Sequence, residues 1–203
     1  MNDQGSTFFR IVFLGPPGCG KGTQAEELVR ELGLPVIGAG RLLREKARED
    51  SEVGRLVAGC VNSGKIVPDE VTVQLIQEQV AAAGSGGFIL DGFPRHLQQA
   101  LLLGGIGLTH VFDLVVPDQV SRGRIKHRLE SDPQHARADD QSEEAIAERF
   151  AVFKRNHDPL AAHYRERGIL FEVDGVPSIA DVHQSIRKVL GLPPERWHQV
   201  EDS

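Results

Sequence analysis

The stretch Phe9-Arg-Ile-Val-Phe-Leu14, followed directly by Gly15-Pro-Pro-Gly-Cys-Gly-Lys-Gly-Thr23, decides the fold that this sequence predicts. The first six residues form a short apolar run, which is typical of a buried strand, and the glycine- and proline-rich stretch indicates a tight loop. Residues 21–32 continue with apolar side chains at helical spacing, and Gly33 provides a C-terminal stop. A strand, a glycine-rich loop and a helix in this order predict a phosphate-binding loop.

The glycines of this loop suit an anion, because backbone N–H groups can approach it where no Cβ atom stands in the way. The start of the helix adds the positive end of its dipole, and Lys21 supplies a mobile charge for the outer phosphates. The general phosphate-loop pattern has Ser or Thr directly after the lysine. This chain has Gly22 at that position and Thr23 one residue later, so it carries the variant Gly-Lys-Gly-Thr.

Short apolar strands alternate with longer helices along the rest of the chain. Further strands are expected at 35–37, 86–91, 110–116 and 168–173, and helices at 41–49, 53–61, 69–80, 119–129, 142–165 and 179–190. This alternation predicts an α/β fold with three layers, in which helices cover both faces of a five-stranded parallel sheet. We expect a single domain over residues 1–203, with a helical insert at 38–67, a polar loop at 127–140 and a loose tail at 191–203.

Composition and charge exclude several classes of protein. The 203 residues, 40% hydrophobic and 26% charged, suffice for one domain with a sizeable core and are not typical of a disordered chain. A net charge of −6 does not favour non-specific nucleic-acid binding. Cys19 and Cys60 are too few for a four-thiolate zinc site or a disulfide framework. The N-terminus lacks the features of a signal peptide, and no apolar run approaches the roughly 18 residues of a membrane span. We therefore expect a cytoplasmic protein that binds neither nucleic acid nor membrane.

Several segments resemble the adenylate kinases and related nucleoside monophosphate kinases. The loop through Gln24 is similar to the family's opening signature Gly-x-Pro-Gly-x-Gly-Lys-Gly-Thr-Gln, and Asp91-Gly-Phe-Pro-Arg-His-Leu-Gln-Gln99 to its segment Asp-Gly-Phe-Pro-Arg-x-x-x-Gln. Gly40-Arg-Leu-Leu-Arg44 and Gly64-Lys-Ile-Val-Pro-Asp-Glu70 match further segments. The resemblance covers nearly the whole chain and implies a monomeric enzyme that transfers a phosphoryl group in line from Mg·ATP to AMP, giving two ADP. No covalent intermediate and no strong base are needed, because the accepting phosphate oxygen is already anionic.

On the ATP side, the resemblance implies binding by the loop, by an arginine pair four positions apart on one helix face, and by the backbone after the fifth strand. These residues are Gly18, Cys19, Gly20, Lys21, Gly22, Thr23, Arg124, Arg128, Val176 and Pro177. Asp91 ends a strand, where an α/β sheet presents its ligand groups, and its carboxylate can hold the water shell of Mg²⁺. The resemblance implies that Mg²⁺, the expected cofactor, binds mainly through nucleotide phosphates and water.

On the AMP side, the resemblance implies contacts from the insert at 38–67, from the segment after Asp91, and from two arginines that close on the phosphates. These residues are Ala39, Arg44, Lys65, Ile66, Val67, Gly92, Arg95, Gln99, Arg137 and Arg149. The catalytic set implied by the resemblance is Lys21, Asp91, Arg95, Arg128, Arg137 and Arg149. Residues 127–140 would form a short lid that lacks cysteines, so no zinc is expected there.

Departures from the family pattern bear on the acceptor. UMP/CMP kinases carry Ala at position 39, which favours a pyrimidine acceptor, but they usually have Asn at position 99. We give Gln99 the greater weight, because an amide with both a donor and an acceptor can read a base edge directly and a methyl group cannot. Arg41 replaces an acid near the phosphates, which would suit a nucleotide-binding relative with little transferase activity. UMP/CMP kinase and this non-enzymatic relative are therefore the alternatives.

Four other side chains are interpreted as structural. His96 and His157 stand where Thr is common in the family, and we expect both to be exposed replacements. Arg122 and Arg155 each have an aspartate at helical spacing, Asp118 and Asp158 respectively, so we expect exposed ion pairs rather than phosphate contacts.

Overall fold

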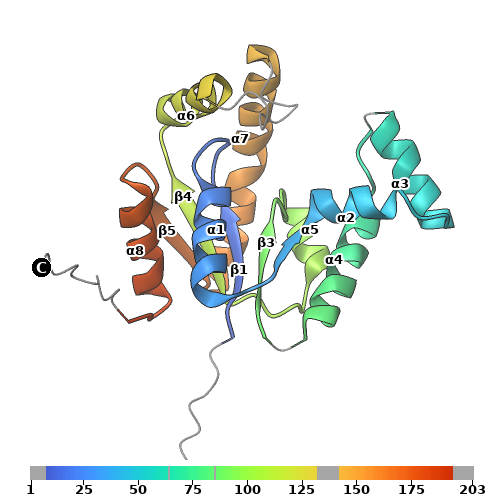
Figure 1. The fold of residues 1–203 in the computed structure, drawn as a ribbon, viewed down its shortest axis with the longest axis horizontal. Coiled ribbons are helices and arrows are strands. Elements are labelled where there is room, and N and C mark those ends of the chain that lie inside the picture. The colour runs from blue at the N-terminus through green and yellow to red at the C-terminus, as the bar shows by residue number, and fades with distance from the viewer. Residues whose placement is uncertain (1–7, 64, 85, 132–141, 194–203) are drawn as a thin grey trace, which may run out of the picture.

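The computed structural model describes residues 8–63, 65–84, 86–131 and 142–193 (Figure 1). These residues contain a five-stranded sheet, all parallel, with the strand order β2-β3-β1-β4-β5. The strands are β1 (Arg10–Leu14), β2 (Val36–Gly38), β3 (Phe88–Asp91), β4 (His110–Val115) and β5 (Leu170–Asp174). The five-stranded parallel sheet expected from the sequence is confirmed.

The helices begin and end within about three residues of the predicted positions, with the exception of α5. They are α1 (Lys21–Leu32), α2 (Ala39–Lys46), α3 (Glu52–Asn62), α4 (Asp69–Ala83), α5 (Leu97–Leu103), α6 (Asp118–Ser131), α7 (Glu143–Glu166) and α8 (Ile179–Val189). Helix α5 was not predicted, because its seven residues are too few for a periodic signal. Helix α6 continues through Ser131, so the polar loop expected from residue 127 begins later. Residues 132–140 and most of the expected tail, 194–203, lie outside the described residues.

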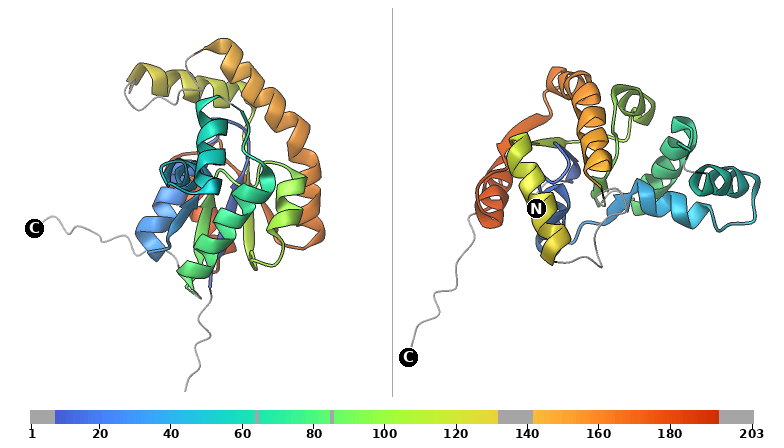
Figure 2. Two further views of the ribbon diagram at one scale, coloured as in Figure 1. Left: turned by 90° about the vertical axis from the view of Figure 1, so that its right-hand side faces the viewer. Right: turned by 90° about the horizontal axis from the view of Figure 1, so that it is seen from above.

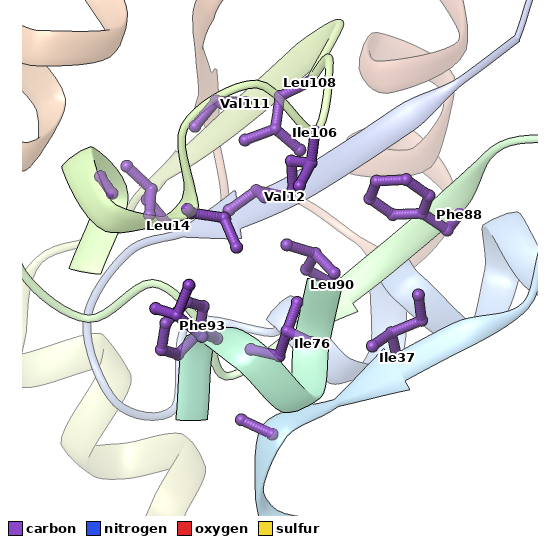
Figure 3. Close-up of a cluster of buried hydrophobic side chains, with 14 of the residues drawn as sticks. Val12, Leu14, Ile37, Ile76, Phe88, Leu90, Phe93, Ile106, Leu108 and Val111 are labelled. Carbon is purple, nitrogen blue, oxygen red and sulfur yellow. The ribbon is translucent and has the colours of Figure 1, made fainter. Parts of the chain in front are cut away.

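Helices cover both faces of the sheet, which gives the three layers (Figures 1 and 2). On one face, side chains of α2, α4, α5 and α7 form a large core cluster with β1 and β3, including Ile76, Leu103 and Tyr164. Figure 3 shows part of this cluster, with Val12, Leu90 and Phe93 converging on Ile76. On the other face, α1 and α8 pack with β1, β4 and β5 in a second cluster. Burial of these apolar faces from water is the main contribution to stability.

A third, small cluster holds α6 against the N-terminal part of α7. Ile125 of α6 packs with Ile146 and Phe150 of α7, and all three side chains are buried. The guanidinium of Arg122 lies over the ring of Phe150, 4.5 Å from its centroid, which adds a cation–π contact. Because Arg128 and Arg149 are carried by these two helices, the cluster fixes the spacing of the helices that bear them.

The prediction that Arg122 and Arg155 form ion pairs with Asp118 and Asp158 is wrong. Arg122 approaches Glu143 at 3.8 Å, and Arg155 approaches Glu148 at 3.7 Å. Asp118 instead pairs with Lys154 across the α6–α7 contact. Helical spacing identifies partners only within one helix, whereas the packing of α6 on α7 brings Glu143 to Arg122. Glu148, by contrast, lies on α7 itself, two turns before Arg155.

The parallel sheet places the carboxyl ends of its strands at one edge. Leu14 leads into the phosphate loop, Asp91 into the segment before α5, and Asp174 into the loop before α8. Helix α3 extends away from this edge, so the insert stands to one side of the sheet (Figures 1 and 2). Among the described helices, none is long and apolar enough to cross a membrane.

Candidate functional site

The loop between β1 and α1 is shaped by close packing at some glycines and open space at others. A Cβ atom at Gly18, whose φ is +79°, would lie 2.6 Å from the carbonyl oxygen of Ser121 and 2.7 Å from Cγ1 of Ile125. Gly18 is therefore required by its contact with α6. At Gly20 and Gly22 an added Cβ would meet open space among the described residues. The backbone there can be approached by a ligand, as expected for a phosphate loop.

Lys21 is folded back on this loop. Its Nζ atom donates hydrogen bonds to the carbonyl oxygens of Gly15 at 2.7 Å and Pro16 at 2.8 Å. It also lies 3.5 Å from Sγ of the buried Cys19, which fits Cys19 as a small, packed loop residue. Lys21 is the first residue of α1, so its ammonium group adds to the positive end of the helix dipole.

A cleft of about 1030 Å³ opens from the phosphate loop along the carboxyl edge of the sheet. This volume lies at the upper end of the range for small-molecule sites. The predicted residues that line it are Gly18, Cys19, Gly20, Lys21, Gly22, Thr23, Asp91, Gly92, Arg95, Arg124, Arg128, Arg149 and Pro177. The loop lysine and four arginines thus converge on one cavity from the loop, α6, α7 and the segment after β3. Such a density of cations suits a polyphosphate.

Protein carbonyl groups surround the guanidinium of Arg124. It donates to the carbonyl oxygens of Cys19 at 3.2 Å, Gly175 at 2.8 Å and Val176 at 2.9 Å. These bonds tie the phosphate loop to the loop between β5 and α8. Arg124 therefore holds together two backbone segments of the cleft.

Part of the predicted AMP set lies away from the cleft lining. The residues that do not line it are Ala39, Arg44, Lys65, Ile66, Val67 and Gln99, together with Val176 of the predicted ATP set. Ala39, the first residue of α2, is buried in the core, whereas Ile66 is 90% exposed. Ala39 and Arg44 belong to α2 and residues 65–67 follow α3, and these two helices stand to one side of the sheet (Figure 1). Arg137 lies outside the described residues.

Two oxygen donors in the cleft fit a magnesium ion. The exposed carboxylate of Asp91 and the hydroxyl-bearing Thr23 both line it, and Mg²⁺ prefers oxygen ligands and retains several of its waters. Among the described residues, no cluster of three or more His, Cys, Asp or Glu side chains has the arrangement of a metal site. Asp91 and Thr23 are therefore the candidate oxygen ligands for such an ion in the cleft.

Gln99 occupies a hydrogen-bonded frame that the sequence did not indicate. Its Oε1 accepts from the backbone N–H of Arg95 at 2.7 Å, and its Nε2 donates to Oδ1 of Asp69 at 2.8 Å. Asp69 is the first residue of α4, directly after the N-cap Pro68. A contact between residues 30 positions apart leaves no periodic signal in the sequence.

The two histidines expected to be exposed replacements are partly buried and paired. His157 on α7 donates from Nε2 to Oδ2 of Asp113 at 2.8 Å, and its Nδ1 lies 3.1 Å from Oδ1 of Asp158. Asp113 is buried in β4, so the pair links α7 to the sheet beneath the cleft. Nε2 of His96 lies 3.3 Å from Oδ2 of Asp69. The expectation for both histidines was wrong, because each compensates a carboxylate from another element.

The His157–Asp113 pair predicts a pH-dependent stability. The hydrogen bond to Asp113 raises the pKa of His157 above its ordinary value of 6.5, against the effect of burial. A pKa that is higher in the folded state stabilises the fold below about pH 6.5, and this contribution is lost as the pH rises through the folded pKa. His157→Gln keeps a neutral donor but cannot titrate. Between pH 6 and pH 9 we expect the wild-type free energy of unfolding to fall by about 1 kcal/mol relative to this variant, in urea titrations. If the free energy of unfolding changes with pH in the same way in the wild type and in His157→Gln, the His157–Asp113 pair does not contribute a pH-dependent stability.

Arg41 has a local partner. Its Nη1 atom lies 3.1 Å from Oε1 of Glu45, one turn along α2, and Nη2 donates weakly to the carbonyl oxygen of Val36 at 3.4 Å. Both side chains are about half exposed, and Arg41 does not line the cleft. An ion pair of this kind contributes little to stability. The contacts of Arg41 with Glu45 and Val36 therefore explain its side chain as part of the exposed surface of α2.

Comparison with known proteins agrees with this geometry. The model of the protein family described as adenylate kinase matches residues 13–169. The chain is 35% identical over 210 residues to an adenylate kinase of Archaeoglobus fulgidus, covering 89% of this chain and 97% of that protein. It is 39% identical over 190 residues to one of Parvibaculum lavamentivorans, covering 90% and 92%. It is 41% identical over 189 residues to one of Jannaschia sp., covering 89% and 98%. The similarity therefore includes the phosphate loop, the insert and α7.

Proposed function

Since this chain belongs to the adenylate kinase family, we propose that its cleft catalyses the reversible transfer of the γ-phosphoryl group of ATP to AMP, giving two ADP. The observation that carries the proposal is the meeting of Lys21 with Arg95, Arg128 and Arg149 around one cavity at the phosphate loop. Two nucleotides that carry many negative charges must be brought together for this reaction, and fixed cations lower the energy of doing so.

On the ATP side, the backbone N–H groups around Gly20 and Gly22 would hold the phosphates. Lys21 would exchange the carbonyl oxygens of Gly15 and Pro16 for phosphate oxygens. Each bond lost is replaced by a stronger one to a charged acceptor. Arg124, bound to Cys19, Gly175 and Val176, would keep the loop aligned with the backbone that receives the adenine.

On the acceptor side, Arg95 and Arg149 would bind the AMP phosphate, and Gln99 would read its base. Arg44 and residues 65–67 of the insert would join this site when α2 and α3 close over the cleft. The 90% exposure of Ile66 supports such a movement, because an apolar side chain would leave water on closure. Closure of the insert and of a lid at 127–140, which would include Arg137, would exclude water as a competing acceptor.

Asp91 and Thr23 would hold a magnesium ion, Asp91 through water molecules. When bound, Mg²⁺ neutralises charge on the phosphates during transfer. The zinc-free lid inferred from the sequence remains a prediction. We further propose a monomer in the cytoplasm, in keeping with the family resemblance and with a sequence that has only two cysteines.

A product assay tests the acceptor. With Mg·ATP and each of AMP, CMP, UMP and GMP, we expect kcat/KM for AMP to exceed the others by at least about a hundredfold, because a site with fixed polar groups rejects mismatched analogues. The products are quantified by chromatography. Preference for CMP or UMP would support the pyrimidine assignment that Ala39 suggested. Nucleotide binding with no turnover of any acceptor would contradict the proposed activity.

A further inference from the structure

The frame around Gln99 fixes its amide with two groups of opposite character. The backbone N–H of Arg95 is 2.7 Å from Oε1, and the carboxylate of Asp69 is 2.8 Å from Nε2. Gln99 is 9% exposed, and the side chain of Asp69 is 22% exposed. The contacts are therefore partly shielded from water, which strengthens them.

This frame permits one orientation of the amide. A backbone N–H can only donate and an ionised carboxylate can only accept, so the oxygen must face Arg95 and the nitrogen must face Asp69. A flipped amide would set two donors against each other at Arg95 and two acceptors against each other at Asp69. Nε2 of His96 lies 3.3 Å from the second carboxylate oxygen of Asp69, Oδ2, and helps to hold the carboxylate in place.

The fixed orientation leaves a defined pattern for a ligand. Oε1 keeps one lone pair and Nε2 keeps one hydrogen, so the amide offers one acceptor and one donor at fixed places. The pairing edge of adenine presents an amino donor beside a ring nitrogen acceptor. Guanine presents a carbonyl acceptor and an N–H donor at the same places. An amide that could flip would accommodate either base, whereas a fixed amide matches only one.

We propose that Asp69 is a positioning residue that prevents Gln99 from flipping and thereby makes the acceptor site discriminate adenine from guanine. This inference rests on the proposed function, in which Gln99 faces the base of the monophosphate. Asp69 acts through Gln99 and need not touch the nucleotide. The hydrogen bond between them belongs to the acceptor side alone, so ATP binding does not depend on it.

Asp69→Asn tests the proposal, because asparagine keeps the volume but can donate as well as accept. We expect kcat/KM for AMP to fall about tenfold and the AMP-to-GMP selectivity to fall by at least as much, while kcat for AMP and KM for ATP stay within about twofold. The loss then appears in KM for AMP. A purely structural role of Asp69 would lower the melting temperature and leave the selectivity unchanged.

Glu78→Gln provides the matched control. Glu78 lies on the same helix, is exposed, and accepts a hydrogen bond from Nε2 of Gln74 at 2.9 Å, so it is also a carboxylate paired with an amide. Glu78→Gln should leave kcat/KM unchanged for both AMP and GMP.

Should Asp69→Asn prove unstable, Asp69→Ala removes the same hydrogen-bond acceptor and can be assayed for the same AMP-to-GMP selectivity. Unchanged AMP-to-GMP selectivity in a folded Asp69 variant would overturn the inference. If the wild-type protein itself does not use AMP, the proposed function fails instead.

Discussion

Lys21→Ala is expected to lower kcat/KM for phosphoryl transfer by about 10³-fold or more while the protein stays folded. In the proposed reaction, Lys21 stabilises charge that develops on the transferring group, which no neutral side chain can do. Its present partners are the carbonyl oxygens of Gly15 and Pro16, and water can replace the ammonium at both in this open cleft. The melting temperature should therefore change by only a few degrees. Steady-state kinetics and circular dichroism measure the two quantities.

Lys188→Ala is the control for this variant, because Lys188 is exposed in the last turn of α8 and does not line the cleft. It removes one positive charge without touching the site. Both variants should melt at similar temperatures, and only Lys21→Ala should lose activity. A folded Lys21→Ala protein with wild-type kinetics would refute the assignment of the loop as the site of transfer.

Most of the fold could be predicted because its signals are local. The apolar run before Gly15, the helical spacing after Lys21 and the stop at Gly33 determine the first strand, loop and helix independently of the rest. The alternation of strands and helices then restricts the sheet to a parallel one. Helix α5 was missed because a helix of two turns has no measurable period. The polar loop was expected from residue 127, four residues before α6 ends, because a polar helix such as α6 carries no apolar periodicity against which to place its boundary.

The candidate site likewise has one part that local sequence signals predicted and another that they could not. Residues in continuous motifs, such as Lys21, Asp91 and Arg95, were found and line one cleft. The roles of Asp69 and Asp113 could not be predicted, because their partners Gln99 and His157 are 30 and 44 positions away. These contacts depend on how α4 and α7 pack against the sheet. The motif identified side chains that line the cleft, and the packing determines which groups hold Gln99 and His157 in place.

Arg95→Ala is expected to lower kcat/KM for AMP by about 10²- to 10³-fold, with a higher KM for AMP and little change in KM for ATP. Arg95 is exposed in the cleft, and its Nε donates to the carbonyl oxygen of Gly92 at 2.9 Å, which helps to hold the guanidinium in place. Arg95→Lys should recover only part of the activity, because an ammonium cannot form two parallel bonds to a phosphate. Arg165→Ala is the control. It removes an exposed arginine that pairs with Glu172 at 2.7 Å outside the cleft, and should leave the rate unchanged.

The same variant separates recognition of the phosphate from recognition of the base. The bond from position 95 to Gln99 comes from the backbone N–H, so it survives the loss of the side chain. Arg95→Ala should therefore lower kcat/KM for AMP and for GMP by the same factor and leave the AMP-to-GMP selectivity unchanged. Asp69→Asn, in contrast, should change this selectivity. If Arg95→Ala shifts the selectivity as strongly as Asp69→Asn, the two residues do not act on separate parts of the acceptor. If AMP turnover is unaffected, Arg95 does not bind the acceptor phosphate.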